Sequence, residues 1–126
     1  MNANVGLLIL RVSTGLIMLF AHGWGKLINF STIAPQFADP IGVGPTVSLA
    51  LAVFAEVFCA VAVIIGLKTR WAVVPLVITM IVAVGIVHGS DPWGKKELGI
   101  MYMISFLVLF FTGPGKYSVD GVMGKE

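Results

Sequence analysis

Four long apolar stretches make up most of this 126-residue chain, and each is close to the length that crosses a lipid bilayer. Apolar residues account for 58% of the sequence and charged residues for only 11%, which is more apolar surface than a soluble domain of this size can bury. About 20 apolar residues span the hydrocarbon core as a helix. We therefore predict an all-α protein: a four-helix transmembrane bundle formed by a single domain over residues 1–126, with helices at about 5–27, 46–67, 71–88 and 97–113.

The Lys and Arg residues between the expected helices predict how the chain lies in the membrane. Four crossings place the N-terminus, the 68–70 turn and the C-terminal tail on one side. That side carries Lys68, Arg70, Lys116 and Lys125, and the opposite side carries Lys26, Lys95 and Lys96. Because cytoplasmic loops hold the excess of basic residues, we predict that both termini are cytoplasmic.

Net charge and cysteine content exclude two classes of function. The formal net charge is only +2, and the basic residues are scattered rather than arranged in a stripe, so we expect no nucleic-acid partner. Cys59 is the single cysteine, so the chain forms no intramolecular disulfide and has no Cys-x-x-Cys redox pair. A thiol–disulfide mechanism carried by this chain unaided is therefore excluded.

Ionisable residues inside the apolar stretches are the candidate functional residues, because a charge in the bilayer is costly unless it has a partner. In the first stretch, Arg11, Gly15, Met18, His22 and Lys26 follow one another at spacings of three or four, so they share one helix face. We expect that face to point into the bundle. The alternative is that Arg11 extends to the lipid headgroups.

Glu56 lies in the middle of the second stretch. At that depth a carboxyl group is either protonated or paired with a cation. Arg11 and His22 lie at suitable depths, and we expect a buried polar core in which Glu56 contacts Arg11 directly or through water. The loss of one partner of such a pair leaves a lone buried charge, which is strongly destabilising.

A second polar group is expected around one end of the bundle. The candidates for ligand binding or proton handling are His22, Lys26, His88, Glu97 and Tyr102. Two histidines on facing helices also suit haem or a metal ion, but neither helix has His-x-x-x-His spacing, so no metal site is predicted and haem is not expected. The alternative for these residues is ordinary helix capping and hydrogen bonding between helices. No catalytic residue is assigned.

The order of these short motifs resembles the DoxX family of small bacterial membrane proteins. The matching residues are Arg11 with Gly15, His22-Gly23, Lys26-Leu27, Glu56, Gly66-Leu67-Lys68-Thr69-Arg70, His88, Glu97 and the run from Gly113 to Asp120. The resemblance covers nearly the whole chain and implies a four-helix, multi-pass protein of the bacterial inner (cell) membrane. It also implies an association with thiosulfate:quinone oxidoreductases, or with membrane complexes that handle sulfur and oxidative stress.

Three functional hypotheses follow. The first is a membrane subunit of a quinone-linked oxidoreductase or redox-stress complex, with a quinone in a polar site inside the bundle. The chain has no flavin, iron–sulfur or dinucleotide fingerprint, so its redox chemistry would come from a partner subunit. The second is a non-catalytic membrane scaffold that assembles as a homo-oligomer or with another chain. The third is transport of a small solute or protons. The sequence leaves open whether the chain is an enzyme and which cofactor it uses.

Overall fold

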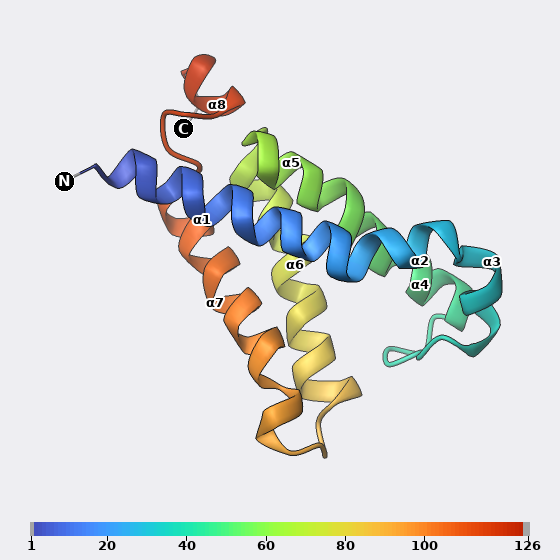
Figure 1. The fold of residues 1–126 in the computed structure, drawn as a ribbon. Coiled ribbons are helices and arrows are strands. Elements are labelled where there is room, and N and C mark those ends of the chain that lie inside the picture. The colour runs from blue at the N-terminus through green and yellow to red at the C-terminus, as the bar shows by residue number, and fades with distance from the viewer. Residues whose placement is uncertain (1, 125–126) are drawn as a thin grey trace.

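The computed structural model describes residues 2–124, and every regular element among them is a helix (Figure 1). This confirms the predicted all-α class. The first helix is the longest, because α1 (Ala3–Met18), a π-helical segment (Leu19–Gly23) and α2 (Trp24–Ile28) follow one another without a break for 26 residues. It occupies the position predicted for the first apolar helix.

Three further long helices follow in the order that the sequence predicts. The second consists of α4 (Pro45–Val53), a π-helical segment (Phe54–Cys59) and α5 (Ala60–Ile65). The third consists of α6 (Thr69–Val82) and a π-helical segment (Ala83–Val87), and the fourth is α7 (Glu97–Thr112). The short helical elements are α3 (Phe30–Ile33), Ala34–Gln36, Trp93–Lys95 and α8 (Val119–Val122).

The first three long helices have the length and composition needed to cross a membrane. They contain 26, 21 and 19 residues. Helix α7 contains 16 residues, or about 24 Å at 1.5 Å per residue, against a hydrocarbon core of about 30 Å. Three candidate spans are therefore established, and the fourth crossing remains a prediction. The orientation also remains a prediction. Lys125, one of the basic residues on which that prediction rests, lies outside the described residues.

The long helices pack as two pairs. The first pair is α1–α2 with α4–α5, the second pair is α6 with α7, and α5 also packs against α6. Figure 1 shows that the pairs lie together near α5 and α8 and diverge toward α2, α4 and the α6–α7 connection. The core residues Met18, Leu49, Val63, Leu76, Phe106 and Leu109 are fully buried. Large apolar side chains on the outer faces, such as Phe20, Phe58 and Phe111, are exposed, as expected of a chain surrounded by lipid.

Two glycines set the register of the first pair. A Cβ added at Gly15 would lie 2.6 Å from the Ile64 side chain, and one added at Gly23 would overlap the Glu56 backbone. Small residues at such points let two helices approach closely. The helices are consequently antiparallel, with Gly23 opposite Glu56 and the C-terminal half of α1 opposite α5.

Arg11 binds the C-terminal segment of the chain, so the predicted contact between Arg11 and Glu56 is wrong. The Arg11 side chain is buried and donates hydrogen bonds to the carbonyl oxygens of Ile64 at 3.3 Å, Pro114 at 2.7 Å and Tyr117 at 2.8 Å. The register explains the error. Arg11 lies beside Ile64, and Glu56 is eight residues away from Ile64, or about 12 Å along the helix.

Asp120 attaches the same segment to the start of α6. Its carboxylate accepts hydrogen bonds from the backbone N–H groups of Lys68 at 2.8 Å and Thr69 at 3.0 Å, and its own N–H donates to the Gly66 carbonyl at 2.9 Å. A carboxylate at a helix N-terminus satisfies N–H groups that have no partner within the helix. Arg11 and Asp120 together close the end of the fold where the two helix pairs meet.

Candidate functional site

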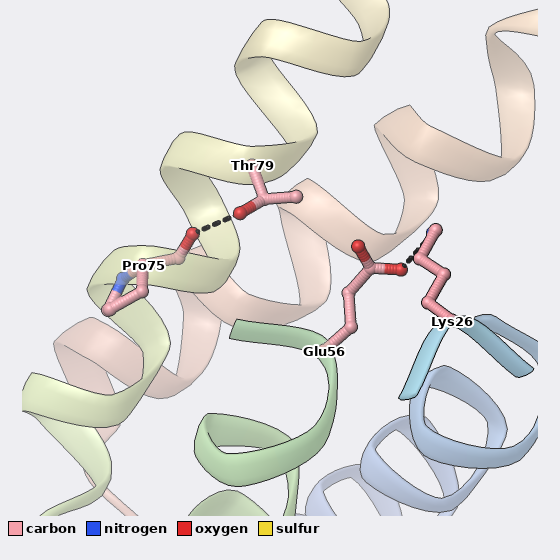
Figure 2. A network of polar contacts seen from close by, with 4 residues as sticks. All are labelled: Lys26, Glu56, Pro75 and Thr79. Atoms are coloured by element: carbon pink, nitrogen blue, oxygen red, sulfur yellow. Dashed lines mark hydrogen bonds and ion pairs between the residues drawn. The ribbon is translucent and has the colours of Figure 1, made fainter. Parts of the chain in front are cut away.

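The buried carboxylate of Glu56 pairs with Lys26. The Lys26 Nζ lies 2.6 Å from Glu56 Oε1, and the side chains are 26% and 4% exposed (Figure 2). Lys26 is one turn beyond Gly23, the residue that lies against the Glu56 backbone. Because helical side chains lean toward the helix N-terminus, the Lys26 side chain reaches back over that turn and meets the carboxylate.

A cavity of about 420 Å³ opens between the two helix pairs, next to this ion pair. Its polar lining consists of His22, Lys26, Ser48, Glu56, Thr79, His88, Lys95 and Tyr102. The other lining residues are mainly apolar and come from the end of α1, the loop before α4, α4, α6, the π-helical segment Ala83–Val87 and α7. A few polar groups in a mostly apolar cavity of this size are typical of a small-molecule site.

The structure brings together most of the residues that the sequence singles out. His22 and Lys26 of the first long helix, Tyr102 of α7 and His88, which follows the π-helical segment Ala83–Val87, line the same cavity as Glu56. Arg11 and Glu97 do not line this cavity, and Glu97 is exposed at the start of α7. The ligand-binding and proton-handling roles of these residues remain predictions.

His22 and Tyr102 form the aromatic side of the site. Their rings meet edge to face, with centroids 5.4 Å apart and an angle of 88°, and the Phe106 ring is stacked with the Tyr102 ring. The Tyr102 hydroxyl is buried and has no hydrogen-bond partner among the described residues. A buried hydroxyl without a partner is destabilising. The Tyr102 hydroxyl therefore remains a donor that a ligand in the cavity could use.

His88 lies at the outer end of the cavity and pairs with Asp91. Its Nδ1 is 2.7 Å from Asp91 Oδ2, and both side chains are partly exposed. The hydrogen bond with His88 lowers the pKa of Asp91 below its usual range. This pairing leaves the other ring nitrogen of His88 for water or for a ligand.

Asp39 holds the loop that forms one wall of the cavity, and the sequence analysis missed it. Its carboxylate accepts hydrogen bonds from Val43 N at 3.0 Å, Gly44 N at 2.9 Å and Ser48 Oγ at 2.9 Å. The hydrogen bond from Ser48, followed by those from the backbone, lowers the pKa of Asp39. The sequence signal was an Asp at the start of a Pro- and Gly-rich turn just before a helix.

Thr79 was also missed, and it belongs to the cavity lining opposite Glu56. Figure 2 shows its hydroxyl donating to the Pro75 carbonyl oxygen one turn earlier, at 2.7 Å. The signal was a threonine inside an apolar helix, because a threonine hydroxyl in a helix donates to the carbonyl oxygen four residues earlier.

The arrangement suits an organic ligand with a polar end. Within residues 2–124, no three His, Cys, Asp or Glu side chains lie close enough together to hold a metal ion. The ammonium group of Lys26 can donate to a ligand oxygen, and Glu56 and His22 can exchange protons with it. The apolar walls would enclose the rest of the ligand.

Comparison with known proteins gives one family and two relatives. The DoxX family matches residues 6–89, more than half of the chain. The inner membrane protein YqjF of Escherichia coli (strain K12) is 28% identical over 127 residues, covering 98% of this chain and 95% of YqjF. The uncharacterized membrane protein Rv3486 of Mycobacterium tuberculosis is 26% identical over 132 residues, covering 93% and 80% of the two chains. No solved structure matches.

Proposed function

The chain belongs to the DoxX family of membrane proteins, and from this premise we propose that it is a membrane subunit that binds a quinone headgroup in the cavity beside Lys26 and Glu56. The observation that carries the proposal is the ion pair at 2.6 Å within a mostly apolar cavity of about 420 Å³. The family membership supports the class of ligand, and the cavity supports the place of binding.

The chemistry of the lining fits the two ends of a quinone. A quinone headgroup carries oxygens that accept hydrogen bonds, and Lys26 and the unpartnered hydroxyl of Tyr102 are donors. Glu56 and His22 are the groups that exchange protons when the bound quinone is reduced or reoxidised. The apolar walls contact the ring and the first part of the tail.

The electrons come from a partner redox subunit in this proposal, because the chain has no flavin, iron–sulfur or dinucleotide fingerprint.

In the same proposal the protein crosses the membrane four times with both termini cytoplasmic, and α7 forms the fourth crossing despite its 16 residues. A shorter helix is accommodated by local thinning of the bilayer.

Binding of a quinone to the purified protein tests the proposal. We expect extraction and mass spectrometry to find quinone in the protein purified in mild detergent, and we expect Glu56→Gln to weaken rebinding about tenfold, since it removes one charged group of the site. Glu97→Gln is the matched control, because Glu97 is an exposed carboxylate that does not line the cavity.

Two results would count against the proposal. A wild-type protein that neither retains nor rebinds quinone refutes the function, and unchanged binding in Glu56→Gln removes Glu56 from the site. Glu56→Gln leaves Lys26 without its partner, so a lower unfolding temperature in Glu56→Gln than in Glu97→Gln would show that a loss of binding comes from misfolding. Thermal unfolding of both variants accompanies the binding measurement.

A further inference from the structure

The cavity has an opening that faces lipid. We infer that the ligand enters from the bilayer between α4 and α6, and that its apolar tail lies in this opening while its polar end lies at Lys26 and Glu56. This inference rests on the proposed function, because it concerns the same cavity. The ligand then enters from the lipid phase, and a long apolar tail contributes to its binding.

Residues that line the cavity and are also exposed mark where it reaches the surface. Leu51 on α4 and Ile78 on α6 both line the cavity and are 51% and 55% exposed. They belong to α4 and α6, which border this part of the cavity, so we take them as the two rims of one opening. The cavity also reaches the surface at its other end, where Ile41, Val87 and Leu98 are exposed. Both rims are apolar. A hydrocarbon chain in such an opening buries apolar surface, which is favourable, whereas water finds no hydrogen-bond partner there.

The opening lies at the depth of the hydrocarbon core. Ile78 is nine residues from Thr69 and nine residues from Val87, the two ends of its helix, or about 14 Å from either end at 1.5 Å per residue. That distance is close to half of the hydrocarbon thickness of about 30 Å. A tail that leaves the cavity past Ile78 therefore enters lipid and not water.

The packing of the helices explains why the opening is there. Helix α6 packs against α5, against the π-helical segment Phe54–Cys59 and along α7. Beyond these contacts the two helix pairs diverge, with α4 on one side and the later half of α6 on the other (Figure 1). Leu51 is five residues before Glu56, or about 8 Å along the helix, so a headgroup at the ion pair places the start of its tail near the rim.

Narrowing the opening tests the inference. The variant is Ile78→Trp, and the matched control is Ile81→Trp, since Ile81 is on the same helix, is 53% exposed and does not line the cavity. The probes are a benzoquinone with a decyl tail and the same benzoquinone with a methyl group in place of that tail. Their dissociation constants are measured in phosphatidylcholine nanodiscs. Each probe is compared with itself across variants, so its partition into lipid cancels.

We expect Ile78→Trp to weaken binding of the decyl probe about tenfold, because the larger side chain occupies the space that the tail needs in the opening. The methyl probe should bind all variants equally, and Ile81→Trp should change neither probe. Leu51→Trp, on the opposite rim, should reproduce the effect of Ile78→Trp.

Three results separate failure of the inference from failure of the proposed function. Unchanged binding of the decyl probe to both rim variants overturns the inference and leaves quinone binding intact. An equal loss for both probes also overturns it, because the substitution then acts on the headgroup site. If neither probe binds the wild-type protein, the proposed function is wrong, and the inference is wrong with it.

Discussion

Replacing Arg11 by methionine should release the C-terminal segment from the rest of the protein. Arg11 donates to three carbonyl groups, those of Ile64, Pro114 and Tyr117, and two of these hydrogen bonds are 2.8 Å or shorter. Methionine fills a similar space but has no donor. The carbonyl of Pro114, which is buried, would then lack its partner.

The expected loss of stability follows from these contacts. A hydrogen bond to a charged group contributes about 1.5–3 kcal/mol, and the buried Arg11 itself costs desolvation that the substitution removes. We therefore expect Arg11→Met to lower the free energy of unfolding by about 2–4 kcal/mol, because three hydrogen bonds are lost and the buried Pro114 carbonyl is left without a partner, while the desolvation of the guanidinium is no longer a cost. That is a large part of the roughly 5–15 kcal/mol that stabilises a typical domain.

Thermal unfolding in detergent, followed by circular dichroism, measures this loss, and limited trypsin cleavage at Lys116 measures release of the segment. Arg70→Met is the matched control, because Arg70 is exposed and donates one hydrogen bond, to the Phe110 carbonyl at 3.1 Å. We expect Arg70→Met to cost less than about 1 kcal/mol. If the two variants unfold at the same temperature and are cleaved at the same rate, the role assigned to Arg11 is wrong.

Two further predictions concern the helix contact and the loop. Gly23→Ala should destabilise the protein by about 1–3 kcal/mol, because its Cβ would overlap the Glu56 backbone, whereas Gly25→Ala, which has nothing within 4 Å, should not; thermal unfolding compares them. Asp39→Asn should lower the unfolding temperature near neutral pH. The folded-state pKa of Asp39 is lowered, so the stabilisation by its carboxylate is present above the usual carboxyl pKa and disappears as pH falls through the lowered value. The unfolding temperatures of wild type and variant should therefore converge in acid. A constant difference at all pH values would contradict this reasoning.

The sequence by itself determined the helices. The apolar stretches predicted at 5–27 and 46–67 correspond to helices at Ala3–Ile28 and Pro45–Ile65, because the length of an apolar run and its bounding Pro and Gly residues act locally. The sequence also identified most of the cavity's polar residues, because an ionisable group within an apolar run is rare enough to stand out. It placed Glu56, Lys26 and the two histidines among its candidates without knowing that they share one cavity.

Only the tertiary structure decided which charged groups meet. Depth estimated along separate helices favoured Arg11 for Glu56, but the contact between Gly23 and the Glu56 backbone sets a register that brings Lys26 to the carboxylate. Arg11 instead binds Pro114, 103 residues later in the chain. The physical reason is that a pairing between helices depends on their register and on the direction in which each side chain leans, and neither can be read from the spacing of residues within one helix.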